Sequence, residues 1–149
     1  MPKVEIVKHI KAPQEKVWDF ISDIEQAPDW VVVMQSLVET TDNPVKEGTI
    51  YRERSKVGPK ESETVWRVTK FKHPHLQVHE CNAPDFRAKL AMEVENKDGE
   101  SVLKHTTEYA LMPVFRPLGW LIESLVVKKQ MIKNLHQSVE NCKQMIEEE

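Results

Sequence analysis

The sequence contains few glycines and cysteines and has no long apolar run, and each of these absences excludes a class of protein. Its four glycines are isolated, so no Gly-rich phosphate loop forms and a nucleotide-binding fold is excluded. Cys81 and Cys142 lie far apart, which argues against a disulfide framework or a zinc ribbon and predicts two buried thiols. No segment approaches the roughly 20 apolar residues of a membrane span, and "MPKVEIVKHI" alternates apolar and charged residues and lacks the continuous apolar run of a secretory signal. We therefore expect a soluble, cytoplasmic protein without stable membrane insertion.

A strong charge of one sign is also missing. The 21 basic and 24 acidic residues give a formal net charge of -3, and the sequence pI is about 6.1. This balance lacks the basic footprint of a nucleic-acid binder, so no DNA or RNA partner is expected. The 149 residues are enough to bury a core as one domain, residues 1–149, and no repeat or low-complexity linker interrupts them.

The N-terminal part of the chain predicts one strand followed by two short helices. Apolar residues alternate with polar ones over residues 4–10, which indicates a strand that ends before Pro13. Beyond Pro13, apolar residues recur at spacings of three and four, as on one face of a helix. We expect this helix to stop or bend near Ser22, and a second short turn to end at Pro28, which leaves Trp30 on a loop.

Residues 34–112 have the alternating pattern of antiparallel strands. Turn residues punctuate them in "NPVKEG", "VGPK", "KHPH", "NAPD" and "NKDG". The predicted strands are Met34–Thr41, Thr49–Val57, Ser62–Phe71, Leu76–Asn82, Phe86–Glu95 and Glu100–Leu111. In the fifth of them, one face is apolar and consists of Phe86, Ala88, Leu90, Met92 and Val94. We therefore expect a sheet with one dry face and one wet face.

A long helix is predicted after Pro117, with an apolar stripe along one side. The stripe consists of Leu118, Leu121, Leu125, Ile132, Leu135, Val139, Cys142 and Ile146. Near its start, further apolar residues such as Trp120 widen the stripe almost all round, whereas beyond Lys128 the seam is narrow. The first half of the helix is therefore expected to be buried on more than one side or to face something apolar.

The order of these elements predicts an α+β protein. One strand is followed by two short helices, six strands and one long helix. A long amphipathic helix needs an apolar face on which to pack, and a curved antiparallel sheet supplies one. With the short helices plugging one end, a space can remain between the sheet and the long helix.

Three segments resemble a known family. The segment "VEIVKHIKAPQEKVWDFISDIEQAPDW" resembles the start of the SRPBCC (START/Bet v 1-like) superfamily, particularly its polyketide cyclase/dehydrase and lipid-transport branch. The segment "VWRVTKFKHPHLQV" is similar to the central hairpin of that family, and "PLGWLIESLVVKKQMIKNLHQSVENCKQM" resembles its C-terminal helix. The resemblance covers essentially the whole chain.

The resemblance implies a helix-grip fold, in which a seven-stranded antiparallel sheet curves around the C-terminal helix. It also implies an apolar cavity between them for lipids, sterols, polyketides or other hydrophobic ligands. Some members of the superfamily are cyclases, aromatases or dehydratases, whereas many only bind or carry ligands. A fold alone does not choose among these functions.

The motif "HPHLQVH" places His73, His75 and His79 close together and raises the question of a metal site. On an extended strand, His75 and His79 would lie roughly 13 Å apart, so the three cannot bind one ion, although His73 and His75 can chelate as a pair. Surface or turn histidines are the favoured interpretation, and we predict no metal site.

The inward face of the strand predicted over residues 76–82 is ambiguous. One register turns His79 and Cys81 toward the cavity, whereas the opposite parity makes Leu76 and Val78 the inner residues.

The final strand carries "LKHTTEYAL", in which Leu103, His105, Thr107, Tyr109 and Leu111 share a face. The leucines and the tyrosine mark that face as the inner one, so the histidine and threonine are expected to point at the cavity. An inward histidine with a pKa near neutrality is what a general acid or base requires. The favoured alternative is an imidazole that is simply hydrogen-bonded in the core or at the cavity wall.

Several aromatic residues are candidates for the cavity wall. Tyr51 and Trp66 alternate with charged neighbours and can line the cavity from the sheet, although core packing is the favoured interpretation. Trp120 lies off the main helical stripe and is interpreted as a guard of the cavity mouth. Trp18 is expected to dock the first helix onto the sheet, and Trp30 to lie beside the cavity. The run "YRERSK" is interpreted as a solvated strand face.

Three functions remain open. The leading hypothesis is a binding module for a small hydrophobic molecule, with polar selectivity from His105, Thr107 and Tyr109. The rival is a polyketide cyclase or dehydratase-type enzyme in which His105, with Tyr109, moves protons. The third is a protein-interaction module, as in chaperone co-factors of the superfamily, which requires a large exposed apolar patch.

No cofactor is predicted, and the oligomeric state stays open. The predicted ligand-binding residues are Trp30, Tyr51, Trp66, Phe86, Leu90, Met92, Leu103, His105, Thr107, Tyr109, Trp120, Leu121 and Leu125.

Overall fold

The computed structural model describes the backbone of residues 2–57, 60–83, 86–111 and 117–148, and the side chains of the same residues except 57, 60, 111 and 117–125. The predicted order of elements is confirmed, and every strand bound lies within two residues of its prediction. The elements are β1 (Lys3–Ile10), α1 (Gln14–Ser22), α2 (Ala27–Trp30), β2 (Met34–Thr40), β3 (Ile50–Val57), β4 (Lys60–Lys72), β5 (Leu76–Asn82), β6 (Phe86–Lys97), β7 (Glu100–Leu111) and α3 (Pro117–Glu148).

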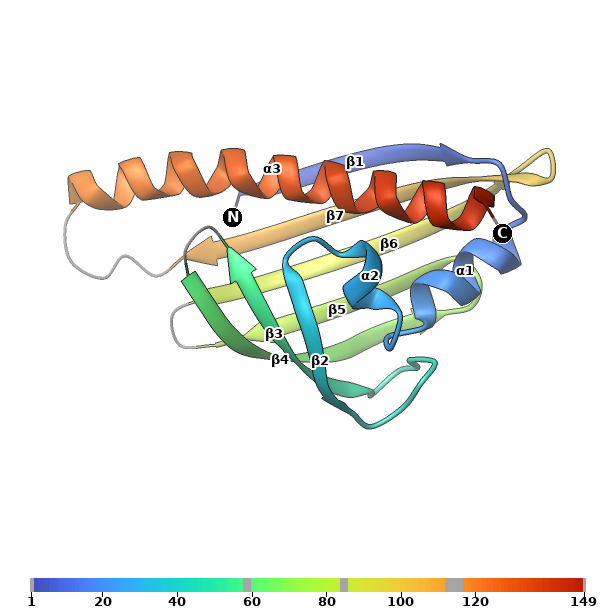
Figure 1. The fold of residues 1–149 in the computed structure, drawn as a ribbon, viewed down its shortest axis with the longest axis horizontal. Helices are drawn as coiled ribbons and strands as arrows, with labels where there is room; N and C mark the ends of the chain where they lie inside the picture. Colours follow the sequence, from blue (N-terminus) through green and yellow to red (C-terminus); the bar gives the residue numbers. More distant parts are fainter. Residues whose placement is uncertain (1, 58–59, 84–85, 112–116, 149) are drawn as a thin grey trace.

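The strands form one seven-stranded antiparallel sheet in the order β1-β7-β6-β5-β4-β3-β2. The first strand therefore pairs with the last, and Ile6 lies opposite His105. Register shifts between β2 and β3 and between β4 and β5 mark bulges, which bend a strand and increase its twist. Figure 1 shows α3 running along the sheet beside β1, with α1 and α2 near its C-terminal half. The predicted sheet around a long helix is confirmed.

The second short helix differs from its prediction. The expected turn ending at Pro28, with Trp30 on a loop, is wrong because α2 begins at Ala27 and ends at Trp30. Proline is tolerated in a first helical turn, where its missing N–H has no helical partner to lose, so Pro28 opens this helix instead of ending it. The backbone N–H of Val31 closes the turn by donating to the carbonyl of Ala27 at 2.8 Å. The predicted end of the first helix at Ser22 is confirmed.

A packed core fills the space between the sheet and α3 at the end occupied by α1. Trp18 is 1% exposed, and its ring lies 5.1 Å from that of Phe71 between ring centroids, which confirms that it docks α1 onto the sheet. The other fully or nearly fully buried members of this core include Ile10, Val17, Val94, Leu103, Val139, Cys142 and Ile146. Because these side chains fill one end, any space under α3 must lie away from that end.

The apolar stripe of α3 follows its prediction in the C-terminal half but not in the middle. Val139, Cys142 and Ile146 are fully buried, whereas Ile132 is 42% exposed. At that level the helix faces the sheet with Met131 and Leu135, and successive residues are rotated by about 100°, which turns Ile132 outward. Both cysteines are buried thiols, as predicted.

Hydrogen bonds tie the segment after α2 to α3. The backbone N–H of Val32 donates to Ser138 Oγ at 2.9 Å, and Ser138 Oγ donates to the carbonyl of Asn134 at 2.8 Å. The side-chain amide of Asn141 donates to the carbonyl of Trp30 at 3.3 Å. These contacts hold the end of α2 against the long helix. Within the described part of the chain, no helix has the length and apolar character needed to cross a membrane.

Candidate functional site

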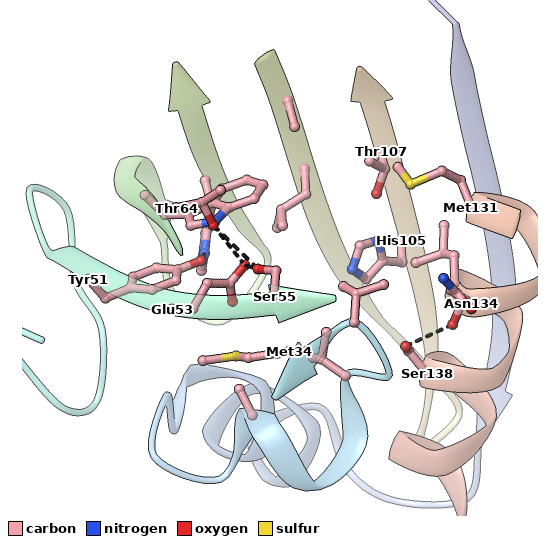
Figure 2. Close-up of a pocket in the computed structure, with 18 of the residues that line it drawn as sticks. Met34, Tyr51, Glu53, Ser55, Thr64, His105, Thr107, Met131, Asn134 and Ser138 are labelled. Carbon is pink, nitrogen blue, oxygen red and sulfur yellow. Dashed lines mark hydrogen bonds between the residues drawn. The ribbon is translucent and has the colours of Figure 1, made fainter. Parts of the chain in front are cut away.

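A cavity of about 380 Å³ lies between the curved sheet, α2 and α3. Most of its lining is apolar. The apolar residues are Val4, Ile21, Ile24, Ala27, Trp30, Val31, Val33, Met34, Trp66, Ala83, Phe86, Ala88, Leu90, Met92, Val127, Met131 and Leu135. The polar residues are fewer and come from four strands and from α3, as Figure 2 shows for several of them. An apolar enclosure with a few convergent polar groups is typical of a small-molecule site.

Glu53 is the most unusual polar group of the cavity. It points inward from β3, and the residue is only 7% exposed (Figure 2). Ser55 Oγ donates to Glu53 Oε1 at 3.0 Å, and Thr64 Oγ1 donates to the same oxygen at 3.4 Å. Burial raises the pKa of Glu53 to about 7, although hydrogen bonds from Ser55, Trp66 and Thr64 oppose this rise. A carboxyl group in the cavity therefore changes its charge near neutral pH.

The position of Glu53 corrects the interpretation of "YRERSK" as a solvated strand face. Tyr51, Glu53 and Ser55 are buried on the inner face of β3, and only the alternate residues, such as Arg54, face outward. Side chains of a strand alternate between its faces, so an inward Tyr51 requires an inward Glu53. The alternation of inward and outward side chains was missed because most residues of "YRERSK" are charged.

A chain of buried hydrogen bonds lies beside the carboxyl group. His79 Nε2 is 2.8 Å from Gln77 Oε1, and a carbonyl oxygen only accepts, so Nε2 carries the proton. Nδ1 is then the acceptor, and the hydroxyl of Tyr51 donates to it at 2.8 Å. Gln77 Nε2 in turn donates to Ser22 Oγ at 3.0 Å at the end of α1. The chain therefore links the cavity wall to α1.

Burial sets the charge of this chain. It lowers the pKa of His79 to about 3, with a smaller contribution from His105, and it raises the pKa of Tyr51 well above its ordinary value. Both groups are neutral at physiological pH. The chain therefore orders the cavity wall without placing a charge on it.

The ambiguous register of β5 is resolved by the same contacts. His79 and Cys81 face the inside, and His79 lines the cavity, so the interpretation of all three histidines of "HPHLQVH" as surface or turn residues is wrong for His79. His73 is exposed and pairs with Glu15 at 2.9 Å, whereas the Nδ1 atom of His75 lies 3.3 Å from a backbone carbonyl. The three histidines have separate partners, so they form no common ligand set.

His105 lies on the opposite side of the cavity from Glu53, since three strands separate β7 from β3 in the sheet. Figure 2 shows its ring pointing inward from β7, next to Thr107. The residue is 6% exposed, its Nδ1 atom has no hydrogen-bond partner, and burial lowers its pKa to about 4. The indole N–H of Trp30 is likewise buried without a partner. The predicted inward His105 is confirmed, but its pKa is not near neutrality.

The structure brings most of the predicted site residues to one cavity. The residues that line it are Trp30, Tyr51, Trp66, Phe86, Leu90, Met92, His105 and Thr107. Leu103 does not line it because it lies in the packed core near α1, and Tyr109, which is 2% exposed, is buried outside the cavity lining. Trp120, Leu121 and Leu125 fall outside the residues whose side chains the structure describes.

Sequence reasoning missed several polar lining residues. Glu53, Ser55 and Thr64 form one hydrogen-bonded group, and Asn134 and Ser138 approach from α3. A usable signal existed for the first group, because these residues share the strand parity of Tyr51 and Trp66. The helical pair has no such signal, since polar residues also cover the outer face of α3.

Residues 1–147 match the family described as "Polyketide cyclase / dehydrase and lipid transport". The chain belongs to this family. No curated protein matches the sequence. The predicted membership of the SRPBCC superfamily, with its START-like helix-grip fold, is confirmed by the family match and by solved structures of the same fold.

Several solved structures share the fold of this chain at low sequence identity. The protein TTHA0849 from Thermus thermophilus is 19% identical with a TM-score of 0.80, over 97% of both chains. A START superfamily protein from Mycobacterium smegmatis is 11% identical with a TM-score of 0.71, over 97% of this chain and 98% of that one. The di-domain ARO/CYC protein StfQ of the steffimycin biosynthetic pathway is 10% identical with a TM-score of 0.77, over 98% of this chain and 50% of that one. These likenesses establish the fold alone.

Proposed function

We propose that this protein binds a small hydrophobic ligand in the cavity between the sheet and α3. The observation that carries the proposal is the cavity itself, which has about 380 Å³ of space and a mostly apolar lining. Small-molecule pockets have volumes of roughly 300–1,000 Å³ and combine apolar walls with a few polar groups that orient the ligand. The family description, which includes lipid transport, supports the same class of ligand.

The proposal is tested by filling the cavity. Ala88 is 4% exposed and lines the cavity from β6, whereas its neighbour Lys89 is exposed on the outer face of the same strand. Ala88→Phe is expected to weaken binding of the neutral fluorescent probe N-phenyl-1-naphthylamine at least about tenfold, because the added ring occupies the ligand volume. Probe fluorescence is titrated against protein, and circular dichroism checks folding.

Lys89→Phe is the matched control, because it adds the same ring on the outer face of the strand. It is expected to leave probe binding unchanged. Equal affinity of the wild type and a folded Ala88→Phe variant, or no probe binding by the wild type, would contradict a ligand-binding role for the cavity.

A second candidate function is catalysis of proton transfer on a bound ligand, and one observation favours it. The carboxyl group of Glu53 lies in the cavity with a pKa of about 7, which suits a general base or acid better than that of the predicted His105. The carboxylate would take a proton from the carbon next to a ligand carbonyl, which gives an enolate and a neutral carboxylic acid. The acid would exchange this proton with solvent and then protonate the same carbon, so that in D₂O a deuteron replaces the proton that was removed and the carboxylate is regenerated.

For this second candidate, the wild type is expected to accelerate deuterium uptake by 2-undecanone in D₂O. Glu53→Gln should lower that rate at least about a hundredfold, because a general base contributes factors of this size. Loss of the α-proton signal in NMR spectra measures the rate. Exchange no faster than in buffer alone would remove the enzyme alternative.

The third hypothesis, a protein-interaction module, requires a large contiguous apolar patch. The exposed large apolar side chains of the described residues are Val7, Val32, Val38, Ile50, Val65, Val126 and Ile132. Three of them lie on the adjacent strands β2, β3 and β4, and the other four lie on β1, on α3 and in the segment after α2. We do not propose this function for the chain.

A further inference from the structure

The ionisable groups of the cavity are unevenly distributed. Among its described lining residues none is lysine or arginine, whereas Glu53 carries a carboxyl group into the interior. Glu63 also contributes to the lining, but its side chain is 42% exposed and pairs with Arg52 at 3.5 Å on the outer face of the sheet. A bound molecule therefore meets one unpaired acidic group and no cationic side chain among the described residues.

We propose that the cavity selects apolar molecules that carry a protonated amine, with the ammonium group held by the carboxylate of Glu53 and the hydroxyls of Ser55 and Thr64. This inference rests on the proposed ligand-binding function and names the chemical class of the ligand.

The arrangement of oxygens matches an ammonium group. Ser55 Oγ and Thr64 Oγ1 lie 3.4 Å apart, and both are within hydrogen-bond distance of Glu53 Oε1. An ammonium group has three donors and no acceptor, and a hydroxyl that donates to a carboxylate still has lone pairs with which to accept. Trp66 Nε1 donates to Thr64 Oγ1 at 3.0 Å and holds this hydroxyl in place. Two adjacent strands therefore present a fixed group of acceptors to a cation.

The rest of the cavity favours a cation over an anion. A ligand carboxylate would be repelled by ionised Glu53, and the two histidines of the lining, His79 and His105, are neutral above about pH 5 because burial lowers their pKa values. Two buried polar atoms without partners, Nδ1 of His105 and Nε1 of Trp30, belong to residues of the same lining. They provide hydrogen-bonding positions for a second polar group at a distance from the amine.

The ammonium contact also predicts how binding depends on pH. Tyr51, His79 and His105 are the other described titratable side chains inside the cavity, and their shifted pKa values leave all three neutral between pH 6 and 8. Glu63 is the remaining acid of the lining and is already paired with Arg52. Only about a tenth of Glu53 is ionised at pH 6, against about nine tenths at pH 8. Amine binding should therefore strengthen about tenfold over this range.

The experiment compares three molecules with the same tail, namely decylamine, decanol and decanoic acid. Each displaces N-phenyl-1-naphthylamine from the wild type, Glu53→Gln and Glu39→Gln at pH 6 and pH 8, below micelle-forming concentrations. Glu39→Gln is the matched control, because it removes the same charge from an exposed side chain of β2 that pairs with Arg52 and does not line the cavity. At pH 8 we expect decylamine to bind the wild type and Glu39→Gln at least about tenfold more tightly than decanol, and decanoic acid to bind most weakly. In Glu53→Gln the preference for the amine and its pH dependence should disappear.

The outcomes separate this inference from the proposed function. Equal binding of decylamine and decanol, or an amine preference that survives in Glu53→Gln, overturns the ammonium site and leaves a ligand-binding cavity. Failure of all three molecules to displace a probe that binds the wild type also overturns the ammonium site. Failure of the probe itself to bind overturns the proposed function together with the inference.

Discussion

At pH 8, Glu53→Gln is expected to raise the free energy of unfolding by roughly 3 kcal/mol. The pKa of Glu53 is about 7 in the folded protein against an ordinary value of 4.5, and each step of one in pKa corresponds to about 1.4 kcal/mol. An acid whose pKa is raised by folding stabilises the folded state fully below its unfolded pKa, and this contribution is lost as the pH rises toward the folded pKa. The cost therefore develops between pH 4.5 and 7 and remains above pH 7. Glutamine has the shape of the neutral acid and avoids it.

Urea unfolding followed by tryptophan fluorescence at pH 5 and pH 8 measures this effect. The difference between Glu53→Gln and the wild type should be small at pH 5 and near its full size at pH 8. Glu63→Gln removes the same charge from a half-exposed position, so its difference from the wild type should remain within about 0.5 kcal/mol at both pH values. A Glu53→Gln variant that is no more stable than the wild type at pH 8 would show that Glu53 is not a buried carboxylate there.

A destabilising carboxyl group in the cavity is itself an argument for function. Replacing Glu53 by a neutral residue would stabilise the fold at neutral pH, so packing alone gives no reason for its presence. Groups with strongly shifted pKa values are concentrated at functional sites, and functional sites often reduce stability. A cationic ligand would offset part of this loss of stability, because it would form an ion pair with the buried carboxylate of Glu53. The ammonium site and the stability prediction therefore depend on the same physical feature.

The fold could be predicted from the sequence because its main signals are periodic. Alternation located the strands, and a spacing of three and four located the long helix, since both patterns follow from burial of one face. The exceptions occur where another rule acts. Pro28 lies in the first turn of α2 instead of ending it, and Ile132 is exposed at the level where α3 faces a cavity and not a packed core.

The candidate site was harder to predict from the sequence, because a residue's chemical type does not show on which face of its strand it lies. The charged run around Glu53 suggested a solvent-exposed strand face. Because alternate residues of a strand share a face, however, an inward Tyr51 requires an inward carboxylate at Glu53. His105 was correctly placed inward, but its pKa depends on how deeply the ring is buried, which no local pattern reveals. Tyr109 shares the strand face of His105 and is still outside the cavity. Where the packed core ends and the cavity begins depends on how α1 fills one end of the sheet, which is a property of the assembled fold.

His79→Ala is expected to lower the free energy of unfolding by roughly 3–5 kcal/mol at pH 7. The substitution removes a ring that is 3% exposed, and it leaves the hydroxyl of Tyr51 and the carbonyl of Gln77 without their partner. Tyr51→Phe is the matched control. It removes one hydroxyl and keeps the imidazole, so that only Nδ1 of His79 loses its partner, and it should cost about 1–2 kcal/mol. Chemical unfolding of both variants at pH 7 provides the comparison.

The pH dependence of the same variants tests whether His79 is neutral in the folded protein. Its pKa of about 3 lies below the ordinary value of 6.5, so its contribution to stability is present above pH 6.5 and is lost as the pH falls toward 3. Between pH 7 and pH 4.5 the wild type should lose roughly 2.5 kcal/mol of this contribution, which His79→Ala cannot lose. The gap between them should therefore narrow by that amount, whereas Tyr51→Phe should keep the acid sensitivity of the wild type. If the difference in unfolding free energy between the wild type and His79→Ala is the same at pH 4.5 as at pH 7, His79 is protonated in the folded protein at pH 4.5. The donors and acceptors of the Tyr51–His79–Gln77 chain would then differ from those described above.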